Sequence, residues 1–205
     1  MATGDTPMHK VLGIIRDEHR SLSAVLSGLC ELARMARDPS VRPDFAVFRA
    51  MLYYIDTFPE REHHPKEDTF LFARLVARDP EAGALVDALK AEHVAGAQLV
   101  RELERSLSEF ELVWPEGTQA FEAVVQSYAQ FHWNHMRREE KELLPRAEKA
   151  LTAADWEAME TAFGTNNEPI GELRHTNFKA LFQRILHLAP VPVGLGKPWP
   201  AAAGQ

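Results

Sequence analysis

Histidine is the residue type best placed to do chemistry in this sequence. Four of its nine copies, His19, His63, His93 and His135, fall one each on the apolar faces of four predicted long helices. A single histidine on such a face is usually an ordinary hydrogen-bonded core residue. A buried imidazole nevertheless needs partners for its ring nitrogens. Four imidazoles that converge in an apolar core can obtain these partners only from one another, from carboxylates or from a metal ion.

Two carboxylates have the spacing that such a site requires. Glu67 follows His63 by four positions, and Glu139 follows His135 by four. This spacing turns about 40° round a helix and climbs about 6 Å, so both side chains share one face. Buried glutamates without a counter-charge would be costly. The pattern therefore favours a metal site over two solvated glutamates.

The order of these residues suggests two similar helical hairpins. Glu18-His19 precedes the His63/Glu67 pair, and Glu92-His93 precedes the His135/Glu139 pair. Two hairpins related by a pseudo-twofold axis would supply similar ligands to two metals. We expect each metal to receive two histidines, with the two carboxylates able to bridge.

Four further side chains are candidates for a ligand or a supporting hydrogen bond. His64 and Asp68 repeat the four-residue spacing one position out of register with His63 and Glu67. His132 lies three positions before His135 and Tyr128 lies on the same apolar seam, so each is an alternative ligand, a supporting group or a core residue. The spacing leaves these readings open.

A ferritin-like arrangement is a competing interpretation. Glu60-x-x-His63 and Glu172-x-x-His175 resemble the Glu-x-x-His motif of ferritin-like di-iron proteins. The second copy falls outside the four long helices, which weighs against it. His9, His175 and His187 are expected to be surface or ordinary structural histidines.

The elements that must position these residues are helices. Apolar residues recur at steps of three and four over 11–37, 44–78, 80–113 and 118–149, with Gly and Pro at the breaks. Pro59 and Pro65 should kink or split the second helix. The expected fold is all-α: an up-down antiparallel four-helix bundle with one or two extra C-terminal helices.

Three regions are expected along the chain. Residues 1–150 form the bundle, 151–188 a helical appendage, and 189–205 an extended Pro/Gly-rich tail. Thr152 or Asp155 could cap a shorter fifth helix that ends near Gly164. Trp199 in the tail could latch onto a groove of the bundle or onto a second chain. A homodimer through the C-terminal helices or the tail is therefore possible.

Charge and composition exclude several classes of function. The net charge is −7 and no basic cluster is present, which argues against nucleic-acid binding. One cysteine, Cys30, cannot form an internal disulfide or a cysteine-based metal site. No apolar run reaches membrane-span length and no secretory signal is evident, so we expect no membrane association and a cytoplasmic location.

Four motifs together resemble the hemerythrin, or HHE cation-binding, family. They are HHPKED at 63–68, HMRREE at 135–140, Glu18-His19 and Glu92-His93, in the family's order and spacing over residues 10–150. The resemblance implies two non-haem iron ions, oxo- or hydroxo-bridged, with an open position for a small ligand. Four histidines and two glutamates are similar to the di-iron domain of the repair-of-iron-centres proteins, although their N-terminal cysteine segment is missing here.

The sequence departs from the oxygen carriers of that family. Carriers have a second third-helix histidine where this chain has Ala97, and a fourth-helix Asp five positions after its histidine, where we choose Glu139 at four. If nothing replaces the imidazole, both irons keep exchangeable positions, which favours redox chemistry over reversible storage. His132 is the residue that we expect to fill the gap.

The ligand types alone do not select iron, since zinc or manganese would also bind. Two functions stay open: a di-iron protein that binds or reduces oxygen, nitric oxide or peroxide, in stress response or iron-centre repair, and a non-catalytic iron or oxygen sensor. A metal-free interaction bundle is a third reading. The family pattern favours iron.

Overall fold

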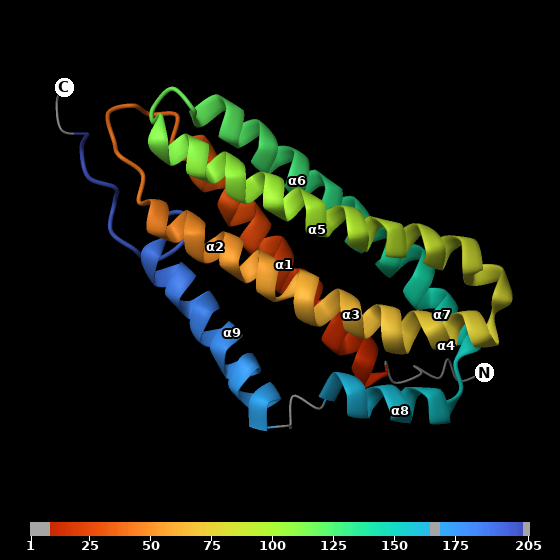
Figure 1. Cartoon of the computed structure of the whole chain (residues 1–205). Helices are drawn as coiled ribbons and strands as arrows, with labels where there is room; N and C mark the ends of the chain where they lie inside the picture. The colour runs from red at the N-terminus through yellow and green to blue at the C-terminus, as the bar shows by residue number, and fades with distance from the viewer. Residues whose placement is uncertain (1–8, 165–168, 203–205) are drawn as a thin grey trace, which may run out of the picture.

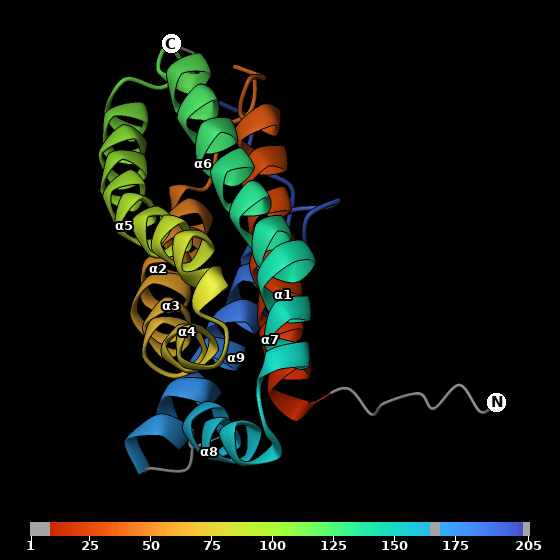
Figure 2. The ribbon, with the colours of Figure 1, turned by 90° about the vertical axis from the view of Figure 1, so that its right-hand side faces the viewer.

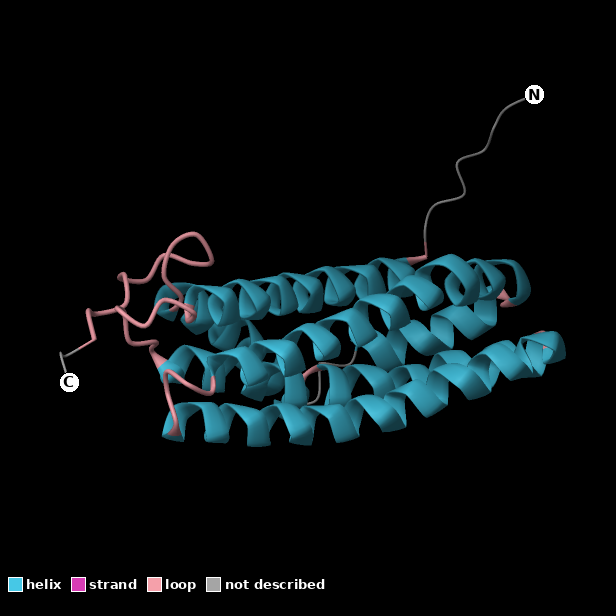
Figure 3. Ribbon diagram, turned by 90° about the horizontal axis from the view of Figure 1, so that it is seen from above, coloured by secondary structure: helices cyan, strands magenta, loops and turns pink. Residues whose placement is uncertain are grey.

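The structure, a computed structural model that describes residues 9–164 and 169–202, is built on four long helical rods packed side by side (Figure 1). The rods are α1 (Lys10–Met35), the run from α2 (Phe45–Thr57) to α4 (Ala73–Arg78), α5 (Gly83–Leu112), and the run from α6 (Thr118–Arg138) to α7 (Leu144–Ala150). Seen from above, the long helices run side by side (Figure 3). α1 packs against α2 and α6, and α5 packs against the same two helices. The expected all-α antiparallel bundle with extra C-terminal helices is confirmed.

The second and fourth rods contain π-helical turns at the level of the candidate site. In the second rod, η1 (Pro59–His63), α3 (His64–Lys66) and η2 (Glu67–Phe72) follow α2, and the fourth rod contains η4 (Glu139–Leu143). The prolines at 59 and 65 lie in this interrupted stretch, as expected. Glu67 and Glu139 each begin a π-helical turn. Such turns occur frequently at functional sites.

The third rod begins as the sequence predicted. Pro80 opens a short 3₁₀ turn, η3 (Pro80–Ala82), directly before α5. Proline suits this place because the first N–H groups of a helix have no partner inside it.

Two apolar clusters lie on either side of a polar layer in the bundle. One cluster contains Leu26, Phe48, Phe110 and Phe121, and the other contains Leu12, Phe72, Leu144 and Trp156. Burial of each such side chain contributes about 1.5–3 kcal/mol. These layers hold in place the polar layer, which contains His19, His93 and the other candidate residues.

Two helices cover the bundle from outside. α8 (Ala153–Gly164) packs against α1 near one end, and α9 (Pro169–Leu188) packs along α2 (Figure 2). Both expected caps of α8 are present: Thr152 N–H donates to the Asp155 carboxylate at 2.9 Å, and Asp155 N–H donates to Thr152 Oγ1 at 3.3 Å. Within the described ranges, no helix has the length and apolar character needed to cross a membrane.

The tail returns to the bundle and packs on it. Trp199 is buried and its ring lies 6.1 Å from that of Phe48. Arg42 N–H donates to the carbonyl oxygen of Pro200 at 2.9 Å, and Ala202 N–H donates to that of Ser40 at 2.7 Å. The tail is thus hydrogen-bonded to the loop between α1 and α2.

Candidate metal centre

Four imidazoles, one from each rod, converge in the polar layer. The Nε2 atoms of His19 and His63 are 3.2 Å apart, and those of His93 and His135 are also 3.2 Å apart. All four side chains are buried. The structure thus brings the four predicted histidines together as two pairs.

Two fully buried carboxylates lie between the histidine pairs. One Glu67 oxygen is 3.5 Å from His63 Nε2 and 3.7 Å from His93 Nε2. Glu139 lies 3.2 Å from His19 Nε2 through one oxygen, and 3.4 Å from His135 Nε2 through the other. Each glutamate therefore reaches both pairs, as a bridging carboxylate must.

Each of these four imidazoles also contacts a second carboxylate through Nδ1, the ring nitrogen that faces away from the centre. The Nδ1 contacts are His63 with Glu18 at 2.7 Å, His135 with Glu92 at 2.8 Å, His93 with Asp68 at 3.0 Å and His19 with Glu140 at 3.0 Å. An ionised carboxylate can only accept, so Nδ1–H donates and Nε2 faces the centre, where its lone pair can bind a cation once Nε2 carries no proton.

Sequence reasoning did not identify this ring of supporting acids. Each acid lies immediately next to a candidate ligand in the chain, as in Glu18-His19 and Glu67-Asp68, and supports a histidine on a neighbouring rod. That adjacency is the signal which could have found them.

The donor set fits metal ions. None of the four carboxylate oxygens of Glu67 and Glu139 has a hydrogen-bond partner, although both side chains are fully buried. Buried carboxylate oxygens without hydrogen bonds are costly. Cations among four imidazole lone pairs and two carboxylates would satisfy all of these atoms at once.

The two central glutamates have opposite protonation behaviour. Burial, together with the charge of Glu139, raises the pKa of Glu67 well above its ordinary value. Burial acts in the same direction on Glu139, but His135, His19 and His93 outweigh it and hold the pKa of Glu139 well below its ordinary value. Without cations, Glu67 therefore keeps its proton to higher pH than Glu139 does.

The imidazoles also differ in basicity. Burial opposes the charged form of His19, yet Glu139 and Glu140 overcome it and raise its pKa to about 9. Burial likewise opposes the charged form of His93, but Asp68 and Glu139 raise its pKa to about 9. Burial lowers the pKa of His63. At neutral pH His19 and His93 thus each carry a proton that a cation must displace.

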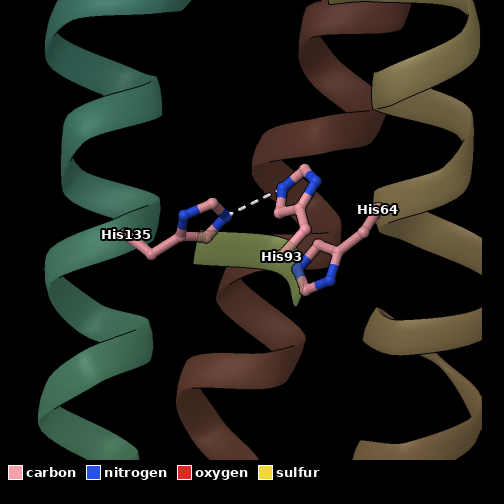
Figure 4. A group of neighbouring side chains, drawn as sticks. All are labelled: His64, His93 and His135. Carbon is pink, nitrogen blue, oxygen red and sulfur yellow. Dashed lines mark hydrogen bonds between the residues drawn. The ribbon is translucent and has the colours of Figure 1, made fainter. Parts of the chain in front are cut away.

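His64 and Asp68, the residues of the alternative register, have different positions in the structure. Glu67 points into the centre, whereas Asp68 is at its edge and accepts from His93. His64 is buried and stacks on His93, with ring centroids 4.1 Å apart (Figure 4). One nitrogen each of His64, His93 and His135 lie within 4.8 Å of one another.

His132 does not fill the position that Ala97 leaves. Its Nε2 lies 3.7 Å from a Glu60 oxygen, and its ring packs on Tyr128 with centroids 4.5 Å apart. Gly96 makes room for this pair, because a Cβ there would lie 3.1 Å from Glu60 Oε1 and 3.3 Å from His132 Cε1. His64, not His132, is the extra imidazole beside His93 and His135.

The ferritin-like alternative gains no support from Glu60. Its carboxylate faces His64 at 3.4 Å and His132 at 3.7 Å, apart from the central glutamates. The side chains of Glu172 and His175 lie outside the described ones. Of the remaining histidines, His9 stacks on Trp156 and His187 is exposed and contacts the carbonyl oxygen of Gln183.

Comparison with known proteins supplies a family. The family described as hemerythrin HHE cation binding domain matches residues 10–147, which span all four rods up to the middle of α7. No curated protein gives a significant match to the chain.

Proposed function

The chain belongs to the hemerythrin HHE cation-binding domain family, and we propose that its centre holds two non-haem iron ions that bind or reduce a small ligand, such as oxygen, nitric oxide or peroxide. One observation carries the proposal: two pairs of imidazole Nε2 atoms share two buried carboxylates whose oxygens lack other partners. Imidazole and carboxylate would also accept zinc or manganese, so the family supports the choice of iron.

The distances support one assignment of ligands. His19 and His63 would hold one ion and His93 and His135 the other, and the carboxylates of Glu67 and Glu139 would lie between the two ions. Two adjacent irons held there would supply electrons and coordination positions to a small ligand.

The chain's own residues would orient the ligands and exclude water. The ring of carboxylates fixes the Nδ1–H tautomer of each histidine. Phe72 stacks on His93 at 5.5 Å between centroids, and Phe58 stacks on His63 at 6.2 Å. These apolar rings cover the sides of the centre.

A sensor is the second candidate function, and one contact favours it. Phe58, which stacks on His63, also packs edge-on against Phe178 of α9, with centroids 5.2 Å apart. A change at His63 would reach the outer helix through these two rings. The helix α9 would then present the state of the centre at the surface.

Metal analysis and an optical spectrum of the aerobically purified protein test the proposal. About two irons per chain, with charge-transfer bands in the near ultraviolet, are expected. One zinc and no such bands would contradict it. Rapid mixing of the reduced protein with oxygen separates the two candidates, since a catalyst turns over and a sensor stays liganded.

A further inference from the structure

A hollow lined by aromatic side chains lies where the outer helices α8 and α9 approach each other against the bundle (Figure 1). Its volume is about 550 Å³, within the range of about 300–1,000 Å³ that is typical of small-molecule sites. Its walls come from α1, α2, α8 and α9, and from Phe58 at the end of α2. Six apolar or aromatic side chains line this aromatic hollow: Ile14, Tyr54, Phe58, Phe163, Phe178 and Phe182.

The aromatic hollow lies outside the metal centre but borders it. Phe58 and Glu18 both line the hollow, and both also contact His63. Phe58 stacks on the imidazole with centroids 6.2 Å apart, and the Glu18 carboxylate accepts from His63 Nδ1–H at 2.7 Å. A molecule in the hollow would therefore be separated from a candidate ligand of the centre by a single side chain.

The rings of the hollow are arranged to receive another ring. Tyr54 packs on Phe58 with centroids 5.4 Å apart, and Phe178 meets Phe58 edge-on at 5.2 Å. Phe182 lies 6.2 Å from Tyr54. Aromatic pairs prefer offset-stacked and edge-to-face contacts at about 4.5–7 Å. A flat aromatic molecule can make such contacts with several of these rings, whereas a flexible alkyl chain cannot.

The charged groups of the hollow favour an anion. Two acids and two lysines line it, but the acids have cationic or hydrogen-bonding partners of their own. Asp17 pairs with Arg20, and Glu18 accepts from a histidine of the centre. Lys10 and Lys179 are exposed, and among the described residues neither forms an ion pair. The positive charge that remains at the hollow is thus available to a ligand.

We propose that the aromatic hollow is a binding site for a planar aromatic anion, such as an aromatic carboxylate. The ring would lie among Tyr54, Phe163 and Phe178, and the carboxylate toward Lys10 and Lys179. An apolar lining with a few charged groups at one side is the usual construction of a small-molecule site. The inference goes beyond the proposed function, because it does not depend on which metal the centre holds.

Binding of naphthoate to the purified full chain, measured by calorimetry, tests the inference. One naphthoate should bind per chain. Naphthalenemethanol, which has the same ring system without the charge, should bind about threefold to tenfold more weakly, because the attraction to the lysines is lost. Octanoate keeps the carboxylate but has no ring, and should bind more weakly than naphthoate by about threefold or more.

Removal of the two lysine charges tests the place of the anion. Lys10→Gln combined with Lys179→Gln should lower the affinity for naphthoate by about threefold to tenfold and leave that for naphthalenemethanol unchanged. Lys90→Gln is the matched control, because Lys90 is exposed on α5 and does not line the hollow. It should bind both compounds as the wild type does.

Filling the hollow tests the place of the ring. Ser21 lines the hollow, and its Oγ donates to the carbonyl oxygen of Asp17 at 3.0 Å. Ser21→Phe should abolish binding of both naphthalene compounds. Ser108→Phe is the matched control, because Ser108 Oγ donates to the carbonyl oxygen of Glu104 at the same distance on the exposed face of α5. Thermal unfolding checks that both variants are folded.

Three results would overturn the inference. They are the absence of saturable naphthoate binding to the folded wild type, naphthoate affinity that is unchanged in folded Ser21→Phe, and octanoate that binds more tightly than naphthoate. The last result would assign the hollow to a fatty acyl chain. Unchanged naphthoate affinity in the double lysine variant would also contradict the proposed place of the anion. Loss of metal from the centre would not affect these outcomes, so they are distinct from a failure of the proposed function.

Discussion

At the scale of single residues, protons and cations compete for the same atoms. At pH 7 the metal-free centre holds displaceable protons on His19 and His93, whose pKa values are raised to about 9. A cation at Nε2 must displace them. Apparent metal affinity should therefore rise with pH up to about 9 and then level off.

Calorimetric titration with zinc(II) measures this competition. In buffers of different ionisation enthalpy at pH 7, binding should release about two protons per chain, one each from His19 and His93. Binding heats that do not depend on the buffer would show that no protons leave, and would contradict the assignment of these residues as ligands.

Substitution of a bridging glutamate should reduce metal binding more than substitution of the acid next to it in the chain. Glu67→Ala should remove both metals, because Glu67 reaches His63 and His93 in different pairs. Asp68→Asn should only weaken binding, by roughly 10–100-fold, since Asp68 supports His93 from outside. Metal content after dialysis at fixed free metal compares the two. Greater damage from Asp68→Asn would assign the ligand role to Asp68.

Residue type and spacing were enough to predict the six residues that meet in the centre. They did not decide between His64 and His132 as the extra imidazole. Both lie within four positions of a predicted ligand, and neighbouring positions differ by 100° round a helix. Which histidine reaches the centre depends on its contacts with the facing rods. Gly96, which has no side chain, leaves room for His132 beside Glu60, away from the centre.

At the scale of elements, the π-helical turns could not be predicted. Pro59 and Pro65 signalled an interrupted helix, but no residue marks η4, which begins at Glu139. Both central glutamates start such turns. The wider turn follows from packing between rods, which a single segment of sequence does not contain.

The tail should contribute to stability through its buried tryptophan. Trp199→Ala removes an indole that packs on Phe48, and should lower the free energy of unfolding by roughly 3 kcal/mol. Leu195→Ala is the control, because Leu195 is 78% exposed, and should change it by less than about 0.5 kcal/mol. Denaturant unfolding of both variants gives the comparison. Equal effects would show that the tail packing adds nothing.

At the scale of the whole molecule, we expect the polar layer to make the stability of the bundle depend on bound cations. Without them, Glu67 and Glu139 lie buried with unsatisfied oxygens between two apolar clusters. A ligand at 100 times its dissociation constant adds about 2.7 kcal/mol per site. The metal-free protein should therefore melt well below the loaded one in thermal unfolding. Equal melting temperatures would mean that the histidines are not ligands.

The four rods were predictable because their apolar repeats are long and their breaks carry proline or glycine. The placement of α8 and α9 was not. The amphipathic pattern of a helix indicates that one face is buried, but it does not identify the helix that buries it. α9 packs on α2 and α8 packs on α1 through side chains such as Phe178 and Trp156.

The most direct test of the central claim is anomalous diffraction at the iron absorption edge, from crystals of the protein as purified. The account predicts two anomalous peaks, one beside His19 and His63 and the other beside His93 and His135, with Glu67 and Glu139 between them. A single peak, peaks away from these residues, or no iron signal at the centre would contradict it.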